Sequence, residues 1–142
     1  MSKFSDNYTP LFYLSNHTKQ SDYLSTVSGV SPSDVSDTEL GLGLGLILND
    51  QFNEKRGLRP EADGVLRTLI VLTDGACNCS VSIPAKNIRD ENIVIYAIGI
   101  DNYVLANLQA IASSKSHVYE VSTSTELDKF ISTLTSSTCY EP

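Results

Sequence analysis

An aspartate directly follows a strongly apolar stretch in the middle of the chain. Residues 69–73 read Leu-Ile-Val-Leu-Thr, and Asp74 and Gly75 come next. In an open parallel sheet, ligands bind at the carboxyl ends of strands, so Asp74 stands where a metal ligand or a nucleophile would stand. The ordinary alternative for such an aspartate is to cap the turn at Gly75 or the helix that follows.

The residues around Asp74 limit the kinds of site to which it could belong. A phosphatase-type nucleophile needs a second carboxylate two residues earlier, where this chain has Leu72. A dinucleotide-binding loop needs a glycine fingerprint directly after a strand, but Gly41, Gly43 and Gly45 follow a polar segment with a different spacing. A hard cation needs oxygen ligands from several loops, and Asp74 with a loop threonine could supply part of that shell.

Catalysis has little support in the remaining polar residues. We identify no Ser-His-Asp or Cys-His arrangement and no pair of carboxylates suited to acid-base work. His17 and His117 stand alone. We therefore expect a protein without enzymatic activity.

The elements that must position Asp74 alternate regularly in the second half of the chain. The pattern predicts strands at Leu66–Thr73, Ile93–Ile100 and His117–Val121, and helices at 82–89, 103–113 and after Thr123, where Glu126 completes a capping box. Because residues 69–72 and 93–100 are nearly continuous apolar runs, we expect those strands to be buried on both faces. This pattern predicts an α/β fold with a parallel sheet covered by helices, and Asp101 is expected to cap the helix near Tyr103.

The first half of the chain is less regular. Phe4 and Leu11–Leu14 suggest short strands, separated by the turn-forming Asp6, Asn7 and Pro10, and apolar spacing predicts a helix over 19–30 that stops near Gly29. Residues 38–52 are ambiguous because leucines alternate with glycines, but their length favours a helix whose glycines allow a close approach to the sheet. Gly57, Pro60 and Gly64 mark a loop.

Length and charge exclude several classes of function. The 142 residues fit one domain, and the net charge of −7, with ten scattered Lys and Arg, disfavours nucleic acids and anionic membranes as partners. The longest apolar run, 40–48, is half the length of a membrane-spanning helix and contains three glycines, so no membrane insertion is expected.

One feature points to the secretory route, although no signal peptide follows Met1. Asn7, Asn16 and Asn78 each begin an Asn-x-Ser/Thr glycosylation acceptor. The three cysteines are Cys77, Cys79 and Cys139, an odd number. Cys77 and Cys79 are two residues apart and awkward to bridge, so we expect free thiols or partners elsewhere.

Several segments together resemble a von Willebrand factor type A domain. They are TLIVLTDGACN, AKNIRDENIVIYAIGI, LQAIAS, HVYEV, LDKFISTL and the closing Cys139, preceded by KFSD, FYLS, TELGLGLGL and the stretch Gly57-Leu58-Arg59. The resemblance covers nearly the whole chain and implies a Rossmann-like, three-layer α/β fold. It also implies a metal-ion-dependent adhesion site that commonly holds Mg²⁺. Carried over by position, Thr38 matches the family's second-loop threonine and Asp74 its third-loop aspartate.

The chain departs from the family at its start. The family's Asp-x-Ser-x-Ser motif after its first strand is absent, and residues 2–6 do not replace it. That strand lies centrally in the family's sheet, so we expect residues 1–142 to form a partial domain with a gap and unpaired strand edges. The resemblance implies that the signal peptide and the disulfide partner of Cys139 lie in a missing front part. A cooperative melt with tight Mg²⁺ binding by this chain would contradict that hypothesis.

Two functions follow from the resemblance. The first is a non-enzymatic adhesion module of an extracellular or cell-surface protein, which binds matrix proteins such as collagens through Mg²⁺, or Mn²⁺ or Ca²⁺, held by Asp74 and Thr38. The second is a structural interaction domain with a degenerate, metal-free site, in which Thr38 is a plain helix cap. An enzyme with a Rossmann-like sheet is a distant third.

Overall fold

The computed structural model describes residues 1–30, 39–77, 79–123, 125–126 and 131. The strands are β1 (Ser2–Phe4), β2 (Tyr8–Pro10), β3 (Arg67–Thr73), β4 (Ile93–Ile100) and β5 (Val118–Val121). The helices are α1 (Gln20–Ser28), α2 (Leu40–Gln51), α3 (Ser82–Asp90) and α4 (Leu105–Ile111), with short 3-10 turns at Glu54–Arg56, Glu61–Asp63 and Lys115–His117. None of the described helices combines the length and the apolar character that a membrane span requires.

The described strands form two separate sheets. β3, β4 and β5 are parallel neighbours in that order, with Arg67 opposite Ile93 and Ala97 opposite Val118. β1 and β2 form an antiparallel hairpin, in which Phe4 lies opposite Tyr8. No described strand joins the two sheets, which confirms an α/β fold that lacks its central strand.

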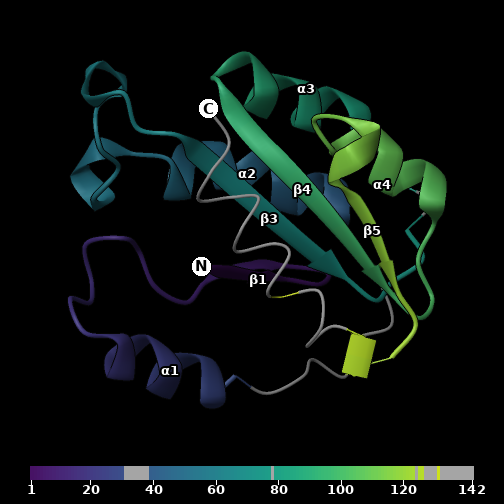
Figure 1. Ribbon diagram of the computed structural model, residues 1–142, viewed down its shortest axis with the longest axis horizontal. Helices are drawn as coiled ribbons and strands as arrows, with labels where there is room; N and C mark the ends of the chain where they lie inside the picture. Colours follow the sequence, from purple (N-terminus) through teal and green to yellow (C-terminus); the bar gives the residue numbers. More distant parts are fainter. Residues whose placement is uncertain (31–38, 78, 124, 127–130, 132–142) are drawn as a thin grey trace.

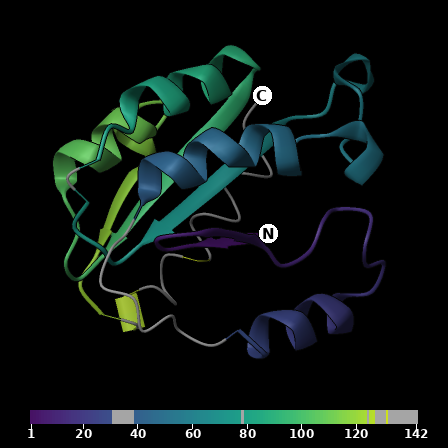
Figure 2. The ribbon, with the colours of Figure 1, turned by 180° about the vertical axis from the view of Figure 1, so that it is seen from behind.

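The core lies between the three-stranded sheet and helices α2, α3 and α4 (Figure 1). Alternate residues of β3 and β4 face these helices, because successive side chains of a strand point to opposite faces. Seen from behind, α1 lies on the other side of the hairpin from α2 (Figure 2). Among the buried apolar residues of this core are Leu40, Leu44, Leu69, Val71, Ala85, Ile88, Ile93, Ile95, Ala97, Leu108 and Ile111.

The leucine-glycine alternation at 40–46 is helical, as predicted. A Cβ atom on Gly41 would lie 2.5 Å from the carbonyl oxygen of Ser80, and one on Gly43 would lie 3.1 Å from the Phe4 ring. The first two glycines thus let α2 approach the loop after β3 and the first strand of the hairpin, whereas Gly45 has nothing within 4 Å of such an atom.

The prediction that β3 is buried on both faces was wrong. Ile70 and Leu72 are 47% and 46% exposed, whereas Leu69 and Val71 are buried. The physical reason is that α2, α3 and α4 cover only one face of the sheet at this strand. β4 has strands on both sides, and its Tyr96 and Ile98 are buried as expected.

The hairpin also differs from its prediction. Residues 11–14 are not a strand, because the turn falls at residues 5–7, where the Ser5 amide donates to the Asn7 carbonyl. The strand that follows the turn pairs at once and ends at Pro10, opposite Ser2.

The predicted cap at Asp101 was wrong. Asp101 has a φ of +57°, outside the extended region of an N-cap, and α4 begins only at Leu105. The cap contact predicted at Thr123 is present, because the Glu126 amide donates to Thr123 Oγ1 over 3.3 Å. Most of the helix predicted to follow Thr123 lies outside the described residues.

Candidate functional site at the carboxyl edge of the sheet

Asp74 follows the last residue of β3 and is exposed. The turn after the strand is closed by Thr73, whose Oγ1 accepts a hydrogen bond from the Gly75 amide over 3.3 Å. Within the described parts of the chain, no group donates a hydrogen bond to the Asp74 carboxylate. Thr73 therefore closes the turn, and the Asp74 carboxylate faces solvent.

The end of β1 and the start of α2 meet at the same edge. The carbonyl of Ser5, directly after β1, accepts a hydrogen bond from the Glu39 amide over 2.7 Å. Ser5 and Asp74 both line the hollow between the two sheets. Thr38, the other predicted metal ligand, lies outside the described residues, so only its neighbour Glu39 is placed.

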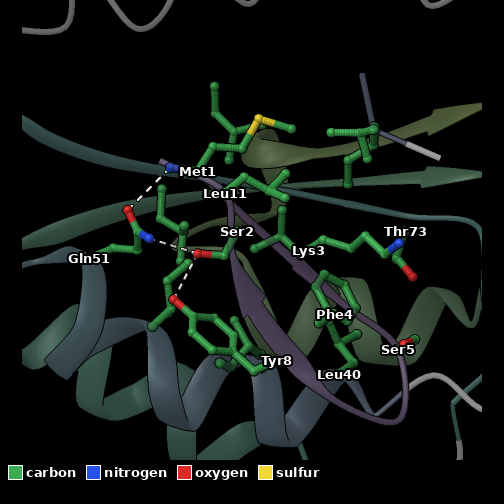
Figure 3. A pocket seen from close by; sticks show the side chains of 18 of the residues that line it. Met1, Ser2, Lys3, Phe4, Ser5, Tyr8, Leu11, Leu40, Gln51 and Thr73 are labelled. Carbon is green, nitrogen blue, oxygen red and sulfur yellow. Dashed lines mark hydrogen bonds between the residues drawn. The ribbon is translucent and has the colours of Figure 1, made fainter. Parts of the chain in front are cut away.

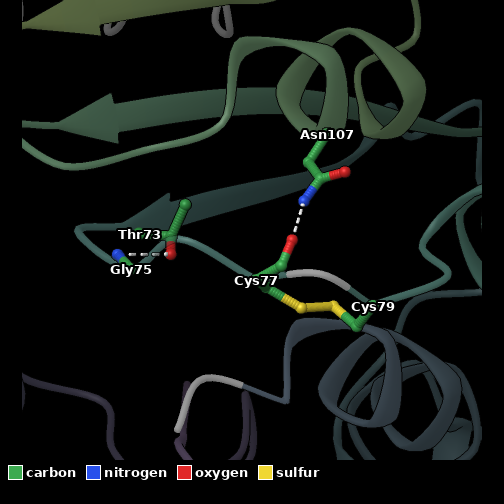
Figure 4. The surroundings of a disulfide bond; sticks show 5 residues. All are labelled: Thr73, Gly75, Cys77, Cys79 and Asn107. Atoms are coloured by element: carbon green, nitrogen blue, oxygen red, sulfur yellow. Dashed lines mark hydrogen bonds between the residues drawn. A yellow bond between two sulfur atoms is a disulfide. The ribbon is translucent and has the colours of Figure 1, made fainter. Parts of the chain in front are cut away.

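The loop after Asp74 contains a disulfide between Cys77 and Cys79 (Figure 4). The expectation that these cysteines pair elsewhere was therefore wrong. Their Cα atoms are 5.2 Å apart, within the range that a disulfide spans. Cys139 and Asn78 lie outside the described residues.

The same loop is held from two sides. Asn107 of α4 donates a hydrogen bond from Nδ2 to the Cys77 carbonyl over 2.6 Å. On the other side, Ser80 lies against Gly41 of α2. Sequence reasoning missed Asn107, which lies on the face of a short helix and has no local signature.

Tyr103 and Glu120 form a second polar contact near this edge. The Tyr103 hydroxyl donates to the Glu120 carboxylate, and this hydrogen bond raises the pKa of the tyrosine. The ring lies over Gly99 of β4, where a Cβ atom would come within 2.4 Å of it. A glycine inside a strand often marks such a close approach, and this was the signal available in the sequence.

The described residues do not compose a cation site by themselves. They contain no group of three His, Cys, Asp or Glu side chains that could hold a metal ion. Mg²⁺ needs six ligands and Ca²⁺ six to eight, and Asp74 is one carboxylate. Of the glycosylation acceptors, Asn7 and Asn16 are exposed.

A parallel α/β sheet, helices packed on one of its faces and an exposed aspartate at its carboxyl edge define a Rossmann-like binding domain. The chain belongs to the von Willebrand factor type A domain family, whose model matches residues 1–133.

The relatives are matrix and adhesion proteins. The chain is 35% identical to the mouse (Mus musculus) collagen alpha-4(VI) chain over 83% of its own length, and 34% identical to mouse matrilin-2 over 72%. It is also 35% identical over 64% of its length to the Caenorhabditis elegans transmembrane cell adhesion receptor mua-3. The matched region is only 5%, 11% and 2% of these three proteins, respectively.

A solved structure has the same fold. Proximal thread matrix protein 1 from the mussel byssus matches 94% of this chain with a TM-score of 0.81 and 29% identity, over 32% of its own chain. Another structure of that mussel protein has a zinc-occupied MIDAS motif, the metal-ion-dependent adhesion site. Membership of this family supports a protein-interaction module.

Proposed function

We propose that this domain is a non-enzymatic module that binds an extracellular matrix or cell-surface protein at the carboxyl edge of its sheet. The observation that carries the proposal is the exposed Asp74, which directly follows β3 and lies beside the end of β1 and the start of α2. A divalent cation held there by Asp74 and Thr38 would bridge to an acidic group of the partner. The remaining ligands would come from outside residues 1–142.

The relatives support this proposal in two ways. Collagens and matrilins suggest matrix proteins, such as collagens, as the class of partner. The zinc described for the mussel protein supports a divalent cation at this edge, for which Mg²⁺, Mn²⁺ and Ca²⁺ are the candidates here. Carboxylate and hydroxyl oxygens are the ligands that such hard cations prefer.

The second candidate is a structural interaction domain without a metal. It is favoured by the described residues, which contain no group of three His, Cys, Asp or Glu side chains that could hold a metal ion. In that case partners would bind through other surfaces, and binding would be unaffected by chelators.

Calorimetric titration of the chain with Mg²⁺ and Mn²⁺ tests the role of Asp74. We expect weak binding, with a Kd on the order of 1 mM, that Asp74→Asn abolishes. Asp90→Asn, which changes an exposed carboxylate on α3, is the matched control and should leave binding unchanged. Equal binding by wild type and Asp74→Asn would remove Asp74 from the site, and retention of collagen or another matrix protein in EDTA would favour the metal-free alternative.

A further inference from the structure

Asn7 lies in the turn of the hairpin, at the carboxyl edge of the three-stranded sheet. The Ser5 amide donates a hydrogen bond to the Asn7 carbonyl over 3.0 Å, and the Ser5 carbonyl accepts one from Glu39, directly before α2. In both ribbon views this turn lies beside the arrowhead of β3, which Asp74 follows (Figures 1 and 2). Ser5 and Thr73 lie at the same end of the hollow between the two sheets (Figure 3). Asn7 therefore stands beside the edge at which the proposed function places the partner.

Asn7 begins a glycosylation acceptor whose geometry suits modification. Asn7 and Thr9, the two residues that define this acceptor, are both exposed. Tyr8 between them turns its side chain toward α2, where its hydroxyl donates to Asp50 over 2.7 Å. Because successive side chains of a strand point to opposite faces, Thr9 points away from α2. Within the described part of the chain no hydrogen bond involves the Asn7 side chain, so its amide group is available for modification.

The disulfide in the loop after β3 is typical of a compartment in which N-linked glycans are added. The Cys77–Cys79 bridge persists where thiols are oxidised, as they are along the secretory route. There the amide nitrogen of an acceptor forms a bond to C1 of an oligosaccharide carried on a lipid diphosphate. The bond between C1 and the diphosphate oxygen breaks, the lipid diphosphate leaves, and the nitrogen loses one proton.

We propose that Asn7 carries an N-linked glycan that shields the carboxyl edge of the sheet from large molecules. A glycan is bulky and hydrated, so it excludes a folded partner from the surface around its attachment point. A cation is small enough to pass the glycan and reach Asp74. The effect on partner binding rests on the proposed function, whereas the presence of the glycan and its shielding of the edge do not.

Asn16 offers a matched glycosylation acceptor away from this edge. Asn16 is exposed, and its Oδ1 accepts a hydrogen bond from the Tyr13 amide over 2.6 Å, which leaves Nδ2 for a glycan. The neighbouring Ser15 amide donates to the carbonyl of Arg56, which is ion-paired with the last turn of α2. The hairpin turn contacts the start of α2, whose 12 residues extend over about 18 Å. A glycan on Asn16 therefore lies at the other end of α2 and should leave Asp74 accessible.

The first test measures whether Asn7 is glycosylated. The chain 1–142 is expressed behind a cleavable secretion signal in animal cells and purified from cells and medium, with Asn78→Gln so that only Asn7 and Asn16 can be modified. Enzymatic removal of the glycans in heavy-oxygen water converts each modified asparagine to a labelled aspartate, which mass spectrometry detects. We expect a glycan on Asn7 in at least about half of the chains, and none after Thr9→Val. An unmodified Asn7 would overturn the proposal.

The second test measures shielding with probes of two sizes. One form carries only the Asn7 glycan, through Asn16→Gln, and the other carries only the Asn16 glycan, through Thr9→Val. Carbodiimide couples either glycine ethyl ester or an amine-ended polyethylene glycol to exposed carboxylates, and peptide mass spectrometry follows Asp74 and Asp90. We expect the polymer to couple to Asp74 at least about threefold more slowly in the form with the Asn7 glycan, and glycine ethyl ester to couple equally in both forms.

An internal control is present in the same samples. Asp90 is exposed on α3, and its coupling should be the same in both forms with either probe. Equal polymer rates at Asp74 in the two forms, or an equal slowing of both probes, would overturn the proposal.

Partner binding separates the glycan shield from the proposed function. On immobilised collagen with Mn²⁺ present, the form without the Asn7 glycan should bind at least about threefold more tightly than the form that carries it. Equal binding by the two forms would overturn the shield. If neither form binds collagen while polymer coupling to Asp74 is slowed, the result counts against the proposed function and supports the shield.

Discussion

The two parts of the molecule on either side of the hollow are stabilised by different interactions. Between Leu40 and Val121 the core contains fully buried side chains, among them Ile88, Ile95 and Leu108. In residues 1–30 no residue reaches that degree of burial. Where a strand has strand neighbours on both sides and helices on one face, as β4 has, apolar packing dominates. Where a strand neighbour is missing, the chain is held by other contacts.

Those other contacts are polar and converge on the last turn of α2. The hydroxyls of Tyr8 and Tyr13 donate to the Asp50 carboxylate over 2.7 and 3.2 Å, and Arg56 forms an ion pair with it over 2.7 Å. Gln51 donates to Ser2 Oγ and accepts from the terminal amine of Met1, as Figure 3 shows. The hairpin is thus tied to α2 at one end of the hollow.

The largest expected effect is in the packed part. Leu108→Ala should lower the free energy of unfolding by about 2–5 kcal/mol, because it opens a cavity at a fully buried position. Leu24→Ala, at a 58% exposed position of α1, should change it by less than about 0.5 kcal/mol. Urea denaturation measures both, and equal losses would show that the two parts share one core.

The next largest loss of stability is expected when the polar contacts between the hairpin region and α2 are removed. Asp50→Ala removes the common acceptor of two tyrosines and Arg56 and should cost about 1.5–3 kcal/mol. The control is Asp90→Ala, which removes an exposed pair with Lys86 and should cost less than about 0.5 kcal/mol. If Asp50→Ala behaves like its control in urea denaturation, polar contacts do not hold the hairpin.

A smaller effect, with opposite signs at two positions, is expected in α2. Gly41→Ala should destabilise the protein by about 1–3 kcal/mol, because its Cβ would meet the Ser80 carbonyl. Gly45→Ala should stabilise it by about 0.5–1 kcal/mol, because the space is open and alanine favours a helix. Thermal unfolding measures the change in melting temperature of both variants. Changes of the same sign would contradict the close contact between Gly41 and the Ser80 carbonyl.

The smallest effect is a loss of stability at alkaline pH. Burial, ahead of the hydrogen bonds and charge around it, raises the pKa of Tyr8 to about 12 from an ordinary value of 10. The folded state therefore favours the neutral phenol, and this contribution is complete below pH 10 and is lost as the pH rises toward 12. The stability difference between wild type and Tyr8→Phe should fall over that range, and a constant difference would contradict the assignment.

The sequence predicted the packed part better than the hairpin. The bounds of β4 were predicted correctly because Ile93–Ile100 is apolar throughout and is buried between two strands. The exposure of Ile70 and Leu72 was missed, because an apolar run cannot reveal whether a covering layer is present. The absence of the central strand was predicted from the family resemblance and not from the periodicity of apolar residues.

The position of Asp74 after a strand was predicted, but the contacts of the loop that follows it were not. Asp74 lies at the end of a strand, as its place after an apolar run implied. The Cys77–Cys79 bridge depends on the conformation of the loop, and Asp101 adopts a positive φ. Neither feature can be read from residue type alone. The metal role of Thr38 and Asp74 stays a prediction.

The disulfide beside Asp74 links the shape of this edge of the sheet to the redox state of the surroundings. Disulfides persist in oxidising compartments, such as the extracellular space, and thiols stay reduced in the cytosol. The loop that carries Cys77 and Cys79 contacts both α2 and α4, so reduction would loosen a segment that spans two helices. The same chain would therefore present a fixed edge in an oxidising compartment and a looser one wherever the bridge is reduced.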